Sequence, residues 1–210
     1  CPICVKSKAK QNQHRQVRTR QPVIQCDFGF LRTESSTATT TVFAAVDILT
    51  GLSMAVVLPS KGDTAYAVTE LKRFILEAGR THGILQCDQE SSIQLILKKA
   101  AAELGHLSVR TSPAYSSSSQ GSVERLHQTL FAQVRALREQ LKERYGLEVN
   151  VGHPLLPWIV RHSSWLVNRY LVHDDGLTSY QKRWNRNYSG GLCEFGETVL
   201  YHQPGRIQAK

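Results

Sequence analysis

No stretch of about 18 consecutive apolar residues occurs in this sequence, which excludes a transmembrane helix of ordinary length. The only methionine is Met54, and neither an initiator methionine nor an apolar signal segment opens the chain, so we expect it to be a piece of a longer protein. Five cysteines in 210 residues are too few for the disulfide framework of a small secreted protein. Their scarcity favours a reducing, intracellular setting.

Acidic residues are also scarce. The chain has 17 of them against 26 lysines and arginines, and its net charge of +9 favours a polyanionic partner, nucleic acid before a membrane surface. On composition alone, a basic protein with no anionic ligand remains the alternative. Residues 1–20 hold six basic residues and no acid, which is typical of an exposed linker or arm that could also bind DNA phosphates.

From Pro22 onward, short apolar runs alternate with amphipathic segments. The apolar runs predict strands at 23–30, 42–48, 52–58, 84–87 and 107–110. The three-and-four spacing of apolar residues predicts helices at 64–79, 91–104, 122–145 and 154–172. This order indicates an α/β fold in which a mixed five-stranded sheet is flanked by helices.

Three acids stand out in this pattern. The tripeptide Gln-Cys-Asp occurs twice, at 25–27 and 86–88, and each copy is expected to end a strand. Ligand sites in α/β sheets gather at the carboxyl ends of strands, so Asp27 and Asp88 converge if their strands are neighbours. Glu124 follows Asp88 with 35 residues between them, in the first turn of the longest helix and off its apolar stripe.

Three nearby residues have simpler explanations. Asp47 follows an apolar run and precedes Thr50-Gly51, so we expect it to cap that turn rather than bind a metal. Cys26 and Cys87 each precede one of the aspartates. Because successive strand residues alternate between faces, both thiols should point into the core, away from the acids.

The loop before Glu124 carries a second signal, Pro113, Tyr115, Ser119, Gln120, Gly121 and Val123 in that order. Together with the two aspartates and the glutamate 35 residues on, this order resembles the catalytic core of retroviral and retrotransposon integrases. Val46-Asp47 followed by Thr50-Gly51 is similar to the second strand of that family. The segment 178–199 looks like the end of the core in copia-type elements. The likeness covers roughly residues 1–200.

The resemblance implies an RNase H-like fold and three regions. Residues 1–20 would be the end of a zinc-binding domain plus a basic linker, 21–189 the catalytic core, and 190–210 the start of a C-terminal region. Cys1-Pro-Ile-Cys4 looks like the second half of the family's His-His-Cys-Cys zinc site. Two thiolates are not enough for structural zinc, so Zn²⁺ is expected only if the missing histidine pair precedes Cys1.

The resemblance also implies a chemistry. Asp27, Asp88 and Glu124 would hold two Mg²⁺ or Mn²⁺ ions, which suit carboxylate ligands. An integrase trims the 3′ ends of its element's DNA and joins them to target DNA. Double-stranded DNA and further copies of the same chain are the implied partners, with no membrane. The implied location is intracellular: a virus-like particle first, and the nucleus at the point of function.

DNA contacts are implied for four residues. Tyr115 and Gln120 match loop positions that contact DNA ends in the family. Arg125 and Gln128 lie on the first turns of the following helix. Retroviral integrases often have two lysines on this face where this chain has Gln128 and Phe131, so Arg125 could supply the charge instead. A solvated helix face is the alternative.

Two other functions remain open. The chain could be another RNase H-like nuclease or a cut-and-paste transposase. It could also be a decayed or domesticated copy that binds DNA without catalysis, although all three acids are present.

Overall fold

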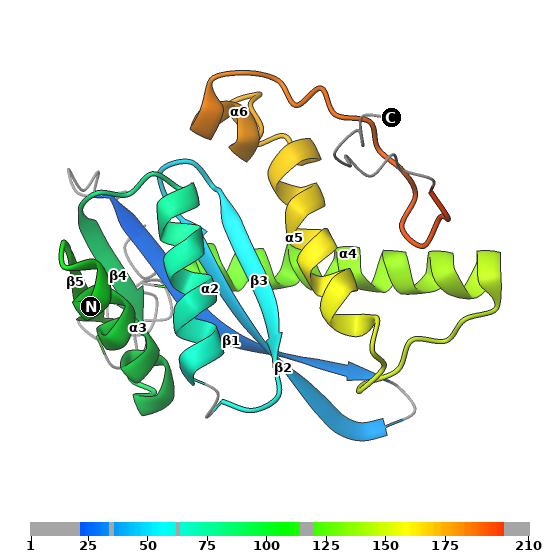
Figure 1. Cartoon of the computed structure of the whole chain (residues 1–210), viewed down its shortest axis with the longest axis horizontal. Helices are drawn as coiled ribbons and strands as arrows, with labels where there is room; N and C mark the ends of the chain where they lie inside the picture. The colour runs from blue at the N-terminus through cyan, green and yellow to red at the C-terminus, as the bar shows by residue number, and fades with distance from the viewer. Residues whose placement is uncertain (1–21, 34–35, 62–63, 114–119, 200–210) are drawn as a thin grey trace, which may run out of the picture.

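The computed structural model describes residues 22–33, 36–61, 64–113 and 120–199 (Figure 1). The elements follow one another along the chain as β1 Val23–Thr33, β2 Ser36–Asp47, β3 Ser53–Leu58, α2 Thr64–Glu77, β4 Gly83–Cys87, α3 Ser91–Leu104, β5 Leu107–Thr111, α4 Gly121–Tyr145, α5 Leu156–Tyr170 and α6 Ser179–Trp184. The strands and helices expected between residues 23 and 172 are all present, and the short helix α6 is an addition. A further strand-like segment expected at 197–201 is not a strand over its described residues 197–199.

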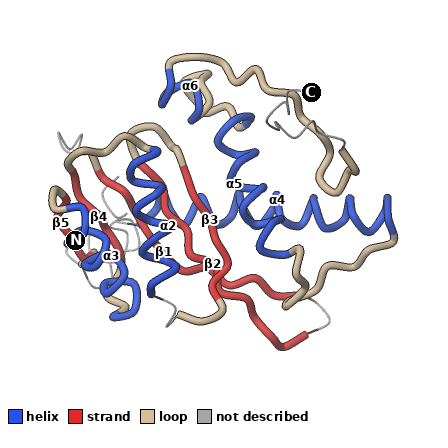
Figure 2. Tube along the Cα trace, viewed as in Figure 1, coloured by secondary structure: helices blue, strands red, loops and turns tan. Residues whose placement is uncertain are grey.

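The strands form one five-stranded sheet in the order β3-β2-β1-β4-β5 (Figure 2). Neighbours β1–β2 and β2–β3 are antiparallel, whereas β1–β4 and β4–β5 are parallel. The predicted mixed sheet is therefore confirmed, and β1 is its central strand.

The first two strands are longer than the apolar runs predicted. Pairing of β1 with β2 continues past Asp27, from Phe28 opposite Phe43 to Arg32 opposite Thr39. The expectation that Asp27 ends its strand is wrong, because threonines extend β2. β-branched threonine suits a strand as well as apolar residues do. Asp27 thus lies within a hydrogen-bonded strand rather than at the start of a loop.

The sheet separates two hydrophobic cores. Alternate residues Ile24, Cys26 and Phe28 of β1 pack in the core that holds α2 and α3. The intervening residues, including Leu31, face the core that holds α4 and α5. In Figure 1, α2 lies in front of the sheet and α4 passes behind it. The face occupied by α4 therefore also carries Gln25 and Asp27.

The segment after α5 is held back onto that helix by aromatic contacts. The Arg169 guanidinium carbon lies 4.3 Å from the ring centroid of Trp165 and 5.1 Å from that of Tyr188. Helix α6 begins with a capping box, in which the Thr178 side chain accepts from the Gln181 backbone and the Gln181 side chain accepts from Thr178. Among the described helices, none has the length and apolarity needed to cross a membrane.

Candidate active site

The two Gln-Cys-Asp tripeptides lie side by side in the sheet. Strands β1 and β4 are parallel neighbours, and Gln25 pairs with Gln86 in their register. Asp27 and Asp88 each follow two residues later, on the same face as the glutamines. The aspartates are therefore adjacent, as predicted, although Asp27 is within its strand and Asp88 directly follows β4. The Asp88 Oδ1 atom accepts a hydrogen bond from the Glu90 backbone N–H at 3.0 Å.

Glu124 reaches the same region from α4. It lies in the first turn of the helix, and its side chain is exposed, off the buried stripe. The start of α4 is joined to β1 by Gln25, whose side-chain Oε1 accepts hydrogen bonds from the backbone N–H groups of Ser122 and Val123, both at 3.2 Å. No local sequence pattern predicts this contact, because it joins residues 97 and 98 positions apart.

The three acids interact electrostatically. Burial is the main reason that the pKa of Asp27 rises from 3.8 to about 6. The negative charges of Asp88, Glu124 and Glu90 raise this pKa further. A hydrogen bond from the Phe28 backbone N–H to Asp27 Oδ1, at 2.8 Å, opposes the rise. Without a bound cation, the ionised form of Asp27 is thus disfavoured.

His127 is a site residue that sequence reasoning missed. Its Nε2 atom lies 3.8 Å from Asp27 Oδ2. Burial lowers the pKa of His127 from 6.5 to about 4, so the ring is neutral near pH 7 and does not balance the aspartate charge. The ring fits because residue 29 is glycine: a Cβ there would lie 2.5 Å from His127 Nδ1 and 2.6 Å from Phe131 Cζ.

The donor set suits a hard divalent cation. It consists of carboxylate oxygens, the ligands that Mg²⁺ and Mn²⁺ prefer. In the part of the chain that the structure describes, no lysine or arginine pairs with Asp27, Asp88 or Glu124. No three potential ligands within the same ranges are close enough to hold an ion as they stand. Binding an ion would therefore require these side chains to close around it.

The other predicted residues fall in different places. Cys1, Cys4 and Tyr115 lie outside the described residues. Arg125 and Gln128 are exposed on α4, where DNA could reach them. Gln120, the residue before α4, is only 6% exposed, and neither its amide nitrogen nor its amide oxygen has a hydrogen-bond partner among the described residues.

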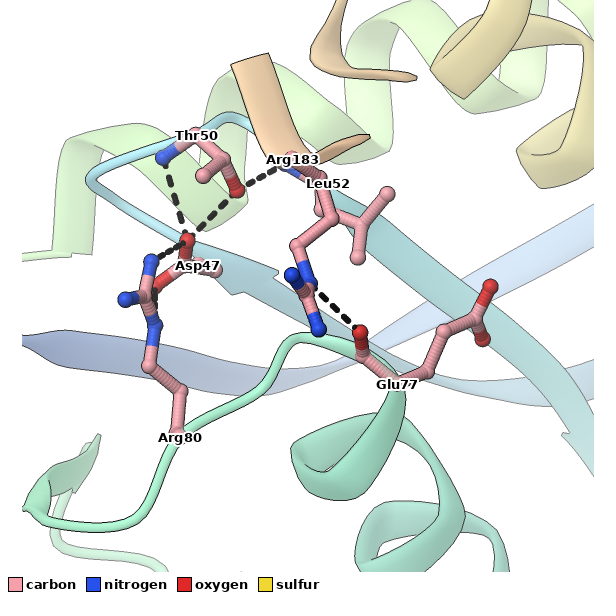
Figure 3. Close-up of polar contacts among 6 residues, drawn as sticks. All are labelled: Asp47, Thr50, Leu52, Glu77, Arg80 and Arg183. Atoms are coloured by element: carbon pink, nitrogen blue, oxygen red, sulfur yellow. Dashed lines mark hydrogen bonds and ion pairs between the residues drawn. The ribbon is translucent and has the colours of Figure 1, made fainter. Parts of the chain in front are cut away.

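Asp47 is confirmed as a turn-capping residue. Its fully buried carboxylate accepts from the Thr50 backbone N–H at 3.0 Å and from the Thr50 hydroxyl (Figure 3). Arg80 forms an ion pair with the same carboxylate, with Nε 2.9 Å from Oδ1. Cys26 and Cys87 are fully buried in the core on the opposite face of the sheet, also as predicted.

A basic groove runs along α4 beyond the acids. We use this name for a cavity of about 580 Å³ lined by the bases Arg32, Arg135, Arg138 and Lys142, the acids Glu139 and Glu148, and five others: Phe30, Leu31, Phe131, Val149 and Asn150. It adjoins the acidic site, because Phe131, which lines it, also lies close to Gly29 and to the His127 ring. The helix face that begins at Glu124 therefore passes from acidic to basic along its length.

Comparison with solved structures identifies the fold. A chain of the simian T-cell lymphotropic virus intasome, solved with the PP2A regulatory subunit B56 gamma, has a TM-score of 0.61 and 16% identity. The match covers 85% of this chain and 60% of that chain. The HTLV-2 integrase catalytic core domain in complex with magnesium, in its trimeric form, has a TM-score of 0.59 and 15% identity, covering 79% of this chain and 99% of that domain.

The BIV integrase catalytic core domain gives a TM-score of 0.52 and 19% identity over 78% of this chain and 93% of that domain. These neighbours confirm the RNase H-like α/β fold. No protein-family model matches the sequence, and no curated protein matches it either.

Proposed function

We propose that this chain is the catalytic core of a retrotransposon integrase of the copia type. It would trim the 3′ ends of the element's DNA and join them to target DNA. One observation carries the proposal: Asp27 lies within β1 and Asp88 directly follows the neighbouring parallel strand β4, while Glu124 lies in the first turn of a helix that is hydrogen-bonded to β1. The fold shared with retroviral integrase cores supports it.

Asp27, Asp88 and Glu124 would hold the divalent cations. Two such ions, when bound, activate an attacking oxygen and stabilise the leaving oxygen of a phosphodiester. Asp27 is fixed within β1 by its pairing with Ala44 of β2, whereas the side chain of Glu124 is exposed and can close on a substrate. In trimming, the attacking oxygen belongs to water; in joining, it belongs to the freed 3′-hydroxyl. Each step forms one P–O bond to the attacking oxygen and breaks the P–O bond to the departing 3′-oxygen, without a covalent enzyme intermediate.

The basic groove supports DNA as the substrate. It offers four cations against two acids and continues from the acidic site, so a DNA backbone lying in it would present a phosphodiester to the three acids. Gln120, Arg125 and Gln128 lie at the start of α4 and would position the strand end, together with Tyr115. The ion would be Mg²⁺ or Mn²⁺, and one neighbouring core was solved with magnesium.

The wider assembly follows from the same proposal. We assign residues 1–20 to the end of a zinc domain and a linker, 21–189 to the core and 190–210 to the start of a C-terminal region. The protein would act as a homo-oligomer, since the HTLV-2 core was solved in trimeric and dimeric forms, in a virus-like particle and then in the nucleus. Zinc would bind Cys1 and Cys4 only in a chain that also supplies two histidines.

Reversal of strand transfer on a branched DNA substrate tests the proposal. The wild-type chain should resolve the branch with Mg²⁺ or Mn²⁺, and Glu124→Gln should lose at least about a hundredfold in rate, as removal of a key charged group from such a site does. Glu143→Gln is the matched control, because it neutralises an exposed acid on the same helix, five turns further on.

Other outcomes would point to the alternatives. DNA binding without any branch resolution in the wild-type chain would favour a decayed or domesticated copy that only binds DNA. Cleavage of RNA–DNA hybrids, with no action on branched DNA, would favour a different RNase H-like nuclease. Either result would contradict the proposed function.

A further inference from the structure

Helix α4 lacks a capping side chain of its own. The first N–H groups of a helix have no partner within it, and a Ser, Thr, Asp or Asn side chain at the N-cap usually accepts from them. The N-cap residue here is Gln120, and its side chain makes no capping hydrogen bond. The free N–H groups of Ser122 and Val123 instead point to Oε1 of Gln25, both at 3.2 Å.

Gln25 therefore caps α4 from the central strand. A single side-chain carbonyl accepting from the second and third helical N–H groups performs the role of an N-cap residue. Gln25 is only 5% exposed, and its hydrogen bond with the Val123 N–H is buried. An unpaired N–H buried at that position would carry a desolvation penalty of about 1–3 kcal/mol.

The same contact fixes two of the three acids relative to each other. Asp27 lies two residues after Gln25 on the same face of β1, and Glu124 directly follows Val123 in the chain. Only one side chain and one peptide unit thus separate the strand that carries Asp27 from the residue that carries Glu124. The amide supplies the acceptor without adding a fourth negative charge to three crowded acids.

We infer that Gln25 is a positioning residue: by capping α4 across the sheet, it holds Glu124 in register with Asp27 for cation binding. The inference rests on the proposed function, because it assumes that these acids share an ion. It assigns no chemical step to Gln25. It predicts that the acceptor oxygen, rather than the bulk of the side chain, determines cation affinity.

Gln25→Met tests the acceptor, because methionine keeps the length and fills the buried space but accepts no comparable hydrogen bond. We expect Mn²⁺ affinity, measured by calorimetric titration, to fall about tenfold. Amide hydrogen exchange at Ser122 and Val123 should speed up in the same variant. Gln25→Asn withdraws the carbonyl by one methylene and should give the same pair of losses if the methionine variant does not fold.

Gln86→Met is the matched control. Gln86 is the Cα partner of Gln25 in the neighbouring strand, is 4% exposed and belongs to the same tripeptide. Its Nε2 donates to Ser112 Oγ at 3.2 Å and its Oε1 accepts from Arg110. These bonds of Gln86 go to β5 and to the residue after it, whereas those described for Gln25 go to the start of α4. The control variant should lose stability without losing Mn²⁺ affinity or the exchange protection of Ser122 and Val123.

Gln25→Glu provides the rescue. A carboxylate at this position restores an acceptor for the two N–H groups, so their exchange protection should return to the wild-type level. Equal Mn²⁺ affinity and equal exchange protection in Gln25→Met and the wild type would overturn the inference. An equal loss of affinity in Gln86→Met would also overturn it, since general destabilisation would then suffice. A wild-type chain that binds no divalent ion would overturn the proposed function itself.

Discussion

Asp27 lies on the central strand with its carboxyl largely buried, and the neighbouring acids raise its pKa further, to about 6. The unfolded chain releases this proton near the ordinary value of 3.8. Between these two pH values the unfolded state binds fewer protons, so this residue lowers the free energy of unfolding as the pH rises from about 4 to about 6. Above that window the full penalty, about 2–3 kcal/mol, is present.

Asp27→Asn should therefore stabilise the metal-free protein by about 2 kcal/mol at pH 7 and by much less at pH 4. Urea unfolding with a chelator present, at both pH values, measures the difference. His127 has the opposite effect on the pH dependence. Because its pKa is about 4 in the folded protein and 6.5 in the unfolded chain, it lowers the free energy of unfolding as the pH falls below 6.5. In Asp27→Asn only this histidine effect remains, so the free energy of unfolding of the variant should rise between pH 4 and pH 6.5.

Asp174→Asn provides the control, since Asp174 is exposed and lies outside the site. It should change stability little at either pH. A pH-independent effect of Asp27→Asn would contradict the assignment of the raised pKa to Asp27.

At this scale, the acids could be predicted but their supporting residues could not. A repeated tripeptide, a 35-residue spacing and a loop motif are all local patterns, and they indicated Asp27, Asp88 and Glu124. Gln25 and His127 act through contacts with residues about a hundred positions away. No spacing rule connects such pairs, so their roles become visible only when β1 and α4 pack together.

Among the elements, the buried pair Asp47–Arg80 ties the turn after β2 to the segment between α2 and β4. Arg80→Met should lower the free energy of unfolding by about 3 kcal/mol, because it leaves a fully buried carboxylate without its counter-ion. Urea denaturation measures this loss. Adding Asp47→Asn should recover part of it, since the uncompensated charge is then removed.

The exposed pair Lys72–Glu103 offers a comparison. Lys72→Met should cost less than about 1 kcal/mol, as is usual for a solvated ion pair. Equal losses from Arg80→Met and Lys72→Met would show that the burial of Asp47 has no energetic consequence.

The basic groove belongs to α4 and β1 together. Arg135→Ala should weaken DNA binding and reduce the slope of log affinity against log salt concentration by about 1, the change expected when one phosphate contact is lost. Fluorescence anisotropy at several salt concentrations measures both quantities. Lys99→Ala, an exposed base of α3 on the other side of the sheet, should leave the slope unchanged. An unchanged slope in Arg135→Ala would contradict the proposal that DNA binds in the basic groove.

Element boundaries were predictable where burial sets them. The apolar runs of β3, β4 and β5 and the stripes of the long helices appear directly in the sequence. The polar extension of β2 was missed because exposed strand residues need not be apolar. Helix α6 was missed although Thr178 and Gln181 have the spacing of a capping box, since six residues are too few to show an apolar period.

For the whole molecule, cation binding and folding should be linked. A ligand that binds only the folded state stabilises it by about 2.7 kcal/mol when its concentration is a hundred times its dissociation constant. In a domain of this size that corresponds to a rise in melting temperature of roughly 5–10 °C. Calorimetry with and without Mn²⁺ should show this rise in the wild type.

Asp88→Asn should abolish most of that rise, because it removes one of the three carboxylates. Asp174→Asn, outside the site, should retain it. A rise of the same size in all three proteins would indicate that Mn²⁺ stabilises the fold somewhere else.

The close contact at Gly29 affects how related copies of such a sequence should be judged. Gly29→Ala would leave all three acids in place, yet the added methyl would displace the His127 ring beside Asp27 and the Phe131 ring packed against it. Mn²⁺ affinity of this variant should fall although the protein still folds. Among related sequences, an inventory based on the acids alone would therefore count damaged sites as intact, and the residue at position 29 would separate the two groups.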